Sequence, residues 1–421
     1  SNETSTGAEL VQNGNFSEVG SDLVTNGDFS AEGINLVSNP NFTDGVEKIV
    51  DGDFPYPNTA WSLNTGVTVP SAGILDFDGT GGAYASQDIL TSGNSYKVTI
   101  EVADASLTDT LVVFLGATNT ILESVVAADT TIVLYGVAGG LNNRVYVGSW
   151  EGTITSVSVK ELGADWTVVD NDATHYVEFI ETGARFVSPT TSPIVQLKQT
   201  TFTLLANISY KLTVDMTRVS GGVKFETGGV SETFSATTSG TNNTRYITPT
   251  SDVFLTFIRS SSNVDLTFHS VSVQELGADW TLGTGWSIGE DVAISDGSAG
   301  SITQSILSAD VFYKIRVIVT GNPTLLVFSS TSFYGDEAAR TLKNGTHNYY
   351  LQAKVAAFSI TNEGGDACTI TNISTEQLDP NGYWTIGTGW AIGADKAIST
   401  VTGSNSDITQ SILTAGKTYR T

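Results

Sequence analysis

Apolar and polar residues alternate along three equivalent segments of the chain, and this alternation predicts β-strands with one buried face. The segments are 94–102 (NSYKVTIEV), 208–216 (ISYKLTVDM) and 311–319 (VFYKIRVIV). The apolar residues that share one parity are Tyr96, Val98, Ile100 and Val102 in the first segment and Tyr210, Leu212, Val214 and Met216 in the second. A period of two is typical of a half-buried strand.

Two further runs, 110–116 (TLVVFLG) and 130–137 (TTIVLYGV), are almost continuously apolar. Such runs predict central strands that are covered on both faces. Glycine-rich breaks separate the expected strands, and no stretch of the sequence holds three turns of helical periodicity.

The strands expected near 150–160 and 264–274 change parity part-way. Ile154 and Val157 differ in parity, as do Phe268 and Val271. A strict period of two cannot keep both members of such a pair on one face. The pattern therefore predicts a β-bulge near Ser156 and near Ser270, or burial on both faces there.

A repeated hexapeptide divides the chain. ELGADW occupies 161–166 and returns at 275–280, each time after an expected closing strand, and WTLGTGWSIG at 280–289 returns as WTIGTGWAIG at 384–393. Trp61, Trp166, Trp280 and Trp384 lie 104 to 114 residues apart, and each spacing is sufficient for a compact domain. In ELGADW the Leu is expected to end a strand, the Gly to permit a turn and the Trp to enter the next core, which predicts short, restrictive joints.

The repeats predict four modules after an N-terminal region. The predicted parts are an N-terminal region of short strand-turn repeats at 1–47, β-sandwich modules one to three at 48–162, 163–276 and 277–378, and the incomplete start of module four at 379–421. Because the sequence ends at the point where the earlier modules enter a central strand, we expect the natural polypeptide to continue.

A 13-residue repeat fills the N-terminal region, with Leu10, Leu23, Leu36 and Ile49 at equivalent positions. Each unit combines a short apolar strand, a turn through Asn-Gly, Asn-Pro or Asp-Gly, and a Phe; Asn-Gly and Asp-Gly are expected to supply the positive φ angles of tight turns. Units this small cannot enclose a core. They are expected to pack on one another, on module one, on other copies or on a partner, and the alternative is a flexible leader.

Many short strands and modules of this length predict tandem antiparallel β-sandwiches, an all-β fold. A jelly roll is favoured over an immunoglobulin-like topology, because the chain has no Cys pair and no Trp-centred pattern typical of the latter. Cys368 is the only cysteine, which excludes an intrachain disulfide and a cysteine-ligated zinc cluster, and it is expected to be a small buried residue.

Charge restricts the partners. Lys and Arg total 19 against 44 Asp and Glu, a formal net charge of −25. This opposes binding to nucleic acid, which depends on neutralising phosphates. No apolar run is long enough to cross a bilayer, so neither nucleic acid nor membrane insertion is expected. Only 15% of the residues are charged, a composition that favours an extracellular or virion protein.

Several of these stretches resemble a known family. LVTNGDFS at 23–30, GTGWSIG at 283–289, ITQSIL followed by GKTYR, and SVSVKEL at 156–162 are similar to the repeated carbohydrate-binding-like jelly rolls of phage tail fibres and other virion appendages, especially marine ones. The resemblance covers about 49–421. It implies a virion location, a homotrimer and host attachment. The N-terminal region departs from the pattern, because Leu10, Leu23 and Leu36 begin three module openings with no module behind them; we expect it to attach other virion proteins.

The sequence offers little for catalysis or metal binding. His175, His269 and His347 lack metal-site spacing and are expected to be surface or strand residues. The stretch GTGG at 79–82 lacks the Lys and the following helix of a phosphate loop. Residues 76–79 (DFDG) resemble the start of a calcium loop, but its twelfth position is Gln87 rather than Glu, which leaves structural calcium as an alternative to no cofactor. Glu161 and Asp165 are expected to cap turns or solvate the joint rather than to act as a glycosidase pair.

Aromatic rings are the remaining ligand candidates, because flat apolar faces can stack on sugars. The four repeated Trp residues are expected to plug the sandwich cores. Tyr334, Tyr349 and Tyr350 have no counterparts in the other modules and are the predicted ligand-binding residues.

Three functions are consistent with this pattern. The first is a structural, non-catalytic virion appendage protein that acts as a modular spacer and recognises host-surface glycans. The second is a row of carbohydrate-binding modules from a secreted glycan-active enzyme. The third is a bacterial surface adhesin or filament subunit, which a membrane anchor or a strand-exchange terminus would favour.

Overall fold

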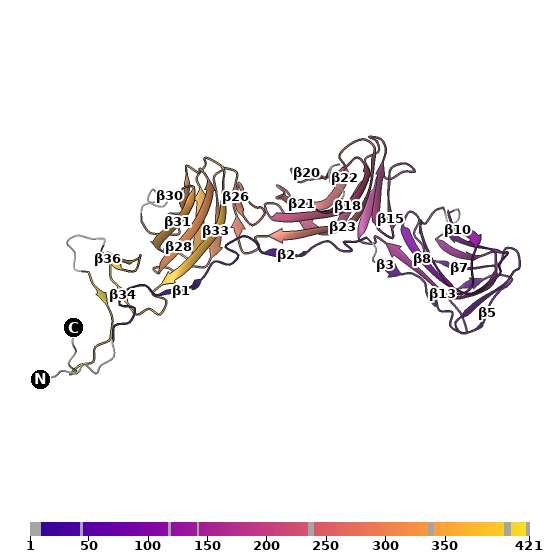
Figure 1. The fold of residues 1–421 in the computed structure, drawn as a ribbon, viewed down its shortest axis with the longest axis horizontal. Coiled ribbons are helices and arrows are strands. Elements are labelled where there is room, and N and C mark those ends of the chain that lie inside the picture. Colours follow the sequence, from indigo (N-terminus) through magenta and orange to yellow (C-terminus); the bar gives the residue numbers. More distant parts are fainter. Residues whose placement is uncertain are drawn as a thin grey trace. The chain divides into compact units, whose positions relative to one another are not determined.

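The structure is a computed structural model, and it describes residues 10–42, 45–116, 119–140, 143–234, 240–335, 341–399 and 406–417. Every regular element in these ranges is a β-strand (Figure 1). The predicted all-β class is confirmed. Within the same ranges no helix is long and apolar enough to cross a membrane.

The chain divides into two compact units. Unit 1 combines Ser1–Ile34, Asn207–Lys211 and Gln274–Thr421, and unit 2 combines Asn35–Ala206 and Leu212–Val273.

Two five-stranded antiparallel arrays form the first sandwich. The strands of one array, in spatial order, are β10 (Asn119–Val125), β9 (Thr110–Leu115), β12 (Arg144–Gly148), β7 (Tyr84–Asp88) and β4 (Ser62–Leu63). The strands of the other are β11 (Thr130–Val137), β8 (Ser95–Ala105), β13 (Glu151–Leu162), β6 (Ile74–Asp78) and β5 (Val67–Ser71). The side chains between them form one buried apolar cluster.

The strand order is that of a jelly roll. If the eight strands from β6 to β13 are numbered one to eight, the two sheets read 1-8-3-6 and 2-7-4-5, the double-sheet arrangement of two Greek keys. The predicted preference for a jelly roll is therefore confirmed for this sandwich.

The second sandwich repeats this order. Its sheets are, first, β15 (Tyr176–Ile180), β16 (Gly183–Ser188), β23 (Val264–Leu276), β18 (Ser209–Ser220) and β21 (Gly240–Ile247), and second, β14 (Trp166–Val169), β17 (Gln196–Leu204), β22 (Val253–Arg259), β19 (Val223–Thr227) and β20 (Val230–Phe234). Strands β16–β23 occupy the same eight positions as β6–β13.

The third sandwich has the same order again. Its sheets are, first, β25 (Trp286–Ile288), β26 (Ala293–Ser295), β33 (Cys368–Leu378), β28 (Phe312–Gly321) and β31 (Gly345–Gln352), and second, β24 (Thr281–Leu282), β27 (Gly300–Ser305), β32 (Ala357–Asn362), β29 (Leu326–Phe328) and β30 (Thr341–Leu342). Two hairpin-like pairs follow it, β34 (Thr385–Ile386) with β37 (Ile408–Thr409) and β35 (Trp390–Ile392) with β36 (Ala397–Ser399). They match the four strands that open the third sandwich.

The alternating segments occupy the centre of each sandwich as the sequence predicts. Tyr96, Val98, Ile100 and Val102 are all buried on β8, and the matching residues of β18 and β28 are buried as well. The prediction for 130–137 is wrong, because β11 is an edge strand and Val133 is 44% exposed. The apolar run therefore belongs to an edge strand that pairs with β8, and not to a central strand buried on both faces. At 110–115, β9 alternates between buried and half-buried residues.

The predicted irregularity of the closing strands is present. The β13 register against β8 shifts on both sides of Ile154, so that Ile154 and Val157 are both buried. On β23, His269 and Ser270 are successive half-buried residues between buried Phe268 and Val271. A similar shift occurs between β28 and β33, where Val319 pairs with Ile370 but Ile318 pairs with Asn372. The bulge at Ser156 is confirmed, and β33 carries one that the sequence reading did not include.

The ELGADW joints form as predicted. Strands β13 and β23 end at Leu162 and Leu276, and Gly163 and Gly277 follow with φ of 62° and 65°. Each joint closes when the Trp amide donates to the glycine carbonyl, at 2.8 Å in both Trp166 and Trp280.

Each of the first three sandwiches also receives a strand from the N-terminal region. β1 (Val19–Asp22) pairs with β33, β2 (Glu32–Asn35) with β23, and β3 (Gly45–Glu47) with β13 (Figure 1). The order is reversed, so the earliest strand of the chain joins the latest sandwich.

The joint supplies a test of close packing. A Cβ on Gly163 would lie 2.5 Å from the Phe179 ring, whereas a Cβ on Gly82, with φ of 80°, would meet nothing within 4 Å. Gly82→Ala should therefore lower the free energy of unfolding by the cost of the left-handed backbone alone, about 1–2 kcal/mol. Gly163→Ala should cost about 1–3 kcal/mol more because of the ring clash. Urea unfolding of the two variants measures the difference, and equal losses would show that the joint is loosely packed.

Candidate functional site

In each sandwich the last strand, which we call the closing strand (β13, β23 or β33), is longer than the strand at one of its edges (β6, β16 or β26). Half of that edge therefore still needs a partner. On β13, residues 151–154 pair with β6, whereas 160–162 pair with β3. Between these, the Val157 amide donates to the Gly52 carbonyl at 2.9 Å and the Lys48 amide to the Val159 carbonyl at 2.8 Å. The N-terminal segment thus completes the edge that β6 leaves open.

The same backbone contacts recur on the other two closing strands. The amides of Val271 and Ile373 donate to the carbonyls of Pro40 and Gly27, at 3.0 and 2.8 Å. A side-chain oxygen at the end of each added strand also accepts from the closing strand; the three pairs are Asp22 with the Thr375 amide (2.8 Å), Asn35 with the Val273 amide (3.0 Å) and Glu47 with the Val159 amide (2.9 Å).

The segment after each added strand is held by one glutamine. We call the four segments Leu10–Phe16, Leu23–Phe29, Leu36–Phe42 and Ile49–Phe54 opening motifs one to four. Gln199 accepts a hydrogen bond from the Ser38 amide at 3.0 Å and donates to the Ser38 carbonyl at 2.6 Å. The equivalent pairs are Gln87 with Val50, Gln304 with Thr25 and Gln410 with Gln12. Gln199 is fully buried, so its amide has no alternative partner in water.

A tryptophan completes each docking site. The indole N–H of Trp166 donates to the Asn39 carbonyl at 3.1 Å, and its ring lies 4.8 Å from the Phe42 ring. Trp61, Trp280 and Trp384 make the same hydrogen bond to Asp51, Asn26 and Asn13, with Phe54, Phe29 and Phe16 against the ring. Trp61, Trp166 and Trp280 are buried, which confirms their predicted place in the core, and the Phe partner of each comes from an opening motif.

The turn of each motif differs from the prediction. Asn13, Asn26, Asn39 and Asp51 have the expected positive φ, but the second positive φ belongs to Phe16, Phe29, Phe42 and Phe54, at 52° to 64°, and not to the glycine. A bulky residue in this region is strained. Its surroundings maintain it, because Phe29, Phe42 and Phe54 are buried.

Each of the four opening motifs therefore docks on one module. This corrects the sequence interpretation that the motifs at Leu10, Leu23 and Leu36 have no module behind them. Motif four lies directly before module one, and motifs three, two and one dock on modules two, three and four. Those three modules follow the ELGADW joint or its third, worn copy without an opening of their own. The N-terminal region supplies the missing openings instead of packing on itself or on module one alone. Each buried Phe contributes about 1.5–3 kcal/mol.

Outside the docking sites, the modules differ in the outer face of the sheet that carries the glutamine. In module one this face carries three half-buried rings on neighbouring strands: Tyr84 on β7, Tyr146 on β12 and Phe114 on β9. Tyr84 and Tyr146 stack at 4.8 Å and Phe114 meets Tyr146 edge-on at 5.1 Å. Close by, Arg144 pairs with Asp88 at 3.1 Å. We call Tyr84, Phe114 and Tyr146 the aromatic cluster.

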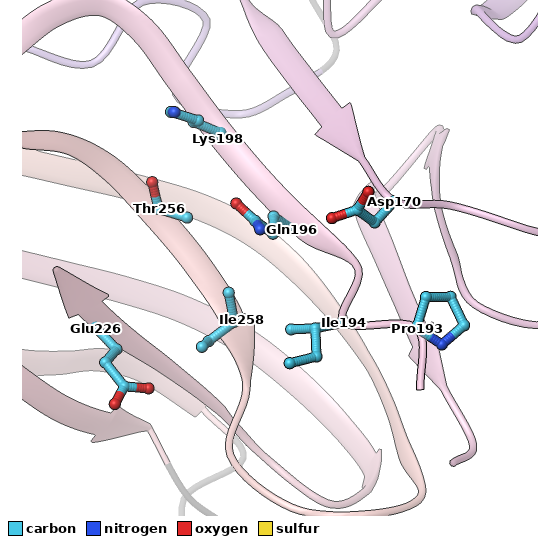
Figure 2. Close-up of a pocket in the computed structure, with 8 residues that line it drawn as sticks. All are labelled: Asp170, Pro193, Ile194, Gln196, Lys198, Glu226, Thr256 and Ile258. Carbon is cyan, nitrogen blue, oxygen red and sulfur yellow. The ribbon is translucent and has the colours of Figure 1, made fainter. Parts of the chain in front are cut away.

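In module two the same face carries an open groove of about 540 Å³ (Figure 2). Its lining residues are Asp170, Pro193, Ile194, Gln196, Lys198, Glu226, Thr256 and Ile258. Figure 2 shows Thr256 and Ile258 on one strand beside Gln196 and Lys198 on the next, in agreement with the β17–β22 register. Lys198 also lies over the Phe254 ring, 4.9 Å from its centre. The groove combines hydrogen-bonding groups with exposed apolar surface, because Ile194 is 46% exposed.

The corresponding face of module three is built from hydroxyl residues. Buried Ile302 and Ile360 point into the sandwich, so Ser301 and Thr361, which pair across β27 and β32, lie on the outer face and share a 2.8 Å hydrogen bond. Three modules with one strand order thus present three chemically different faces.

The three predicted tyrosines do not form one platform. Tyr349 and Tyr350 point to opposite sides of β31: Tyr349 packs edge-on against Phe328 at 5.2 Å, and Tyr350 is 38% exposed. Burial raises the pKa of Tyr349, and its hydroxyl donates to the Thr341 carbonyl at 2.8 Å. A Cβ on Gly393 would lie 2.8 Å from the Cβ of Tyr350, so the start of module four lies against Tyr350.

Tyr334 is the most exposed of the three, at 46%. Its hydroxyl donates to Asp310 at 3.1 Å, and this carboxylate raises the pKa of Tyr334. Lys354 lies 5.4 Å from the centre of its ring. Tyr334 is thus the most exposed of the three predicted ligand residues, and its binding role stays a prediction.

The titratable residues have structural partners. The expectation for His175 is wrong, because it is a buried bend residue between Asp172 and Thr190, with ring nitrogens 3.1 and 2.8 Å from their oxygens. His269 and His347 are strand residues as expected. Glu161 forms an ion pair with Lys48 at 2.6 Å, which holds the residue before motif four instead of solvating the joint. The described residues contain no group of three or more His, Cys, Asp or Glu that could hold a metal ion.

Sequence reasoning missed the four glutamines and the aromatic cluster. A signal existed for both. Gln304 and Gln410 belong to the repeated ITQSIL, at a position whose parity matches the buried side of the strand. Tyr84 and Tyr146 have the parity of the outward face, where an aromatic residue is unexpected.

The chain was compared with protein families, curated proteins and solved structures. No family model matches the chain, and no match was found among curated proteins. The CBM22-1-CBM22-2 tandem domain from Paenibacillus barcinonensis Xyn10C is 11% identical and matches 56% of this chain and 99% of its own, with a TM-score of 0.22. A fucolectin from striped bass (Morone saxatilis) serum is 8% identical and matches 51% and 95%, with a TM-score of 0.21. A chain of Sulfolobus Turreted Icosahedral Virus is 15% identical and matches 76% and 90%, with a TM-score of 0.17. Similarity this low carries no argument about function.

The docking sites predict a local effect of removing one ring. Phe42→Ala should lower the free energy of opening of β23 by about 3–5 kcal/mol, because Phe42 is fully buried between Trp166, Phe179 and Phe268. Phe16→Ala is the control and should leave the module-two amides unchanged, because Phe16 is half-buried against Trp384 of module four. Hydrogen exchange of the Ser38 and Val271 amides measures the effect. Unchanged protection in Phe42→Ala would contradict the role of the motif.

Proposed function

We propose that this protein is a structural, non-catalytic component of a virion appendage, similar to a phage tail fibre, in which the N-terminal region completes successive jelly rolls. The observation that carries the proposal is the fourfold docking of an opening motif on a Trp and a Gln of a module, which in three cases is a module far away in the sequence. Contacts between residues as much as 398 positions apart tie distant parts of one chain together. That property suits a protein that bears load more than one that turns over a substrate.

Other features support the same role. The buried glutamines of the docking sites, such as Gln199, are hydrogen-bonded to backbone groups, so they are not free to act on a substrate. The net charge of −25 disfavours nucleic acid, and the sequence resemblance is to modules of virion appendages. A homotrimer, attachment to other virion proteins through the N-terminal region and the absence of a cofactor belong to this proposal as expectations.

The virion location has a direct test. In a lysate that contains the full chain, the protein should co-sediment with virions, and gold-labelled antibody against it should mark their appendages in electron micrographs. Recovery with a soluble glycan-degrading enzyme would favour the binding-module alternative. Label on the bacterial surface alone would favour an adhesin.

A second function, glycan binding, is favoured by the outer sheet faces. The aromatic cluster offers ring surface on module one, and the groove on module two places Gln196, Lys198 and Thr256 beside apolar side chains. Ring faces that stack on sugars and side-chain hydrogen bonds that fix their orientation are the usual elements of a shallow sugar site. Such a site would let an appendage recognise host-surface glycans.

Glycan binding can be separated from the structural role. On a glycan array, the full chain should bind at least one glycan, and Tyr146→Ala should weaken that binding about tenfold, which corresponds to the roughly 1.4 kcal/mol of one stacked ring. Val133→Ala, an exposed apolar residue on the other sheet of module one, is the matched control and should have no effect.

Tyr334→Ala in the same assay examines the predicted residue. A silent array for the unaltered chain would leave a spacer without glycan recognition. Loss only in Tyr334→Ala would move the site to module three.

A further inference from the structure

Each opening motif is far along the chain from the module that it completes. Motifs one, two and three are 371, 254 and 127 positions away from the Trp that they contact, whereas motif four is 10 positions away. Motif two, for example, exists long before the third sandwich is complete during synthesis. Contacts between such distant residues form slowly and leave complementary segments open to exchange with another copy.

The docking contacts do not depend on which copy supplies the motif. In the third module, Gln304 binds the backbone of Thr25, Trp280 donates to the Asn26 carbonyl, and the Ile373 amide donates to the Gly27 carbonyl. Phe29 fills the space beside the Trp280 ring. All of these are non-covalent, and Cys368, the only cysteine, is buried and free. The same set of contacts can therefore form between two chains without any change in the site.

We propose that the docking site of the third module also accepts motif two from a second copy of this chain, so that copies that fold together exchange their N-terminal regions. Identical elements exchanged between identical chains create an interface from contacts that each chain already makes. Within one folded chain the attached motif has the higher effective concentration. Exchange is accordingly favoured when several copies fold at the same time and at high concentration.

Engineered cysteines can distinguish the two arrangements. Asp22 and Glu376 are partners in the β1–β33 register, and directly opposed residues of antiparallel strands approach closely enough for a disulfide. One full-length chain carries Asp22→Cys with a size tag and another carries Glu376→Cys, and the two are refolded together and then oxidised. Cys368 can stay, because burial raises the pKa of its thiol to about 11 and leaves little reactive thiolate.

The expected result is a disulfide-linked heterodimer on a non-reducing gel, with a yield that rises with protein concentration. The double variant Asp22→Cys/Glu376→Cys, refolded at high dilution, should form the bond within one chain, which shows that the pair is competent. Leu107→Cys, at a position 81% exposed on module one, replaces Glu376→Cys in the collision control. The proposal is overturned if the double variant closes but no heterodimer forms, or if the Leu107→Cys chain is cross-linked equally well.

Discussion

The constraint on which this structure depends is the open edge of each closing strand. Strands β13, β23 and β33 are 12, 13 and 11 residues long, and their first halves pair with β6, β16 and β26. The remaining N–H and C=O groups need partners, because unpaired backbone groups at an edge cost stability and invite pairing with other chains. The added strand, the motif turn and the glutamine satisfy that need together. The bulge lies where the contact changes from one partner to the other.

Much of this could be predicted from local pattern. The alternation around Tyr96 and Tyr210, the parity change at Ser156 and the turn at Gly163 are set by neighbouring residues, and the structure agrees with all of them. The prediction for 130–137 failed because apolar continuity does not distinguish an edge strand that covers its neighbour from a central strand. The role of Gln199 could not be predicted, since its partner, Ser38, is 161 positions away and nothing local links them.

The predicted ligand residues show a related limit. Tyr334, Tyr349 and Tyr350 were chosen because they lack repeat counterparts, yet half-buried Tyr349 packs against the core residue Phe328 and Tyr350 lies against the start of module four. A residue without a counterpart in the other modules can be specific to the packing of its module as well as to its surface. Lack of a counterpart therefore does not identify a ligand-binding residue. Strand parity is the better criterion, because it separates the outward Tyr84 and Tyr146 from inward neighbours such as Ala85 and Val147.

Placing the openings apart from their modules has a structural consequence. A module with its own opening, such as module one, can complete its closing strand from residues nearby in sequence. Modules two and three complete theirs with a segment at the far end of the chain, and the start of module four binds motif one through Trp384 and Gln410, so all three depend on the integrity of residues 10–42. Damage to one motif removes one Phe and one glutamine contact from one module, while the shared strand order lets the outer faces vary freely. The modules thus depend on the N-terminal region because their opening motifs lie there. Their outer faces can differ because the docking sites lie elsewhere on the module.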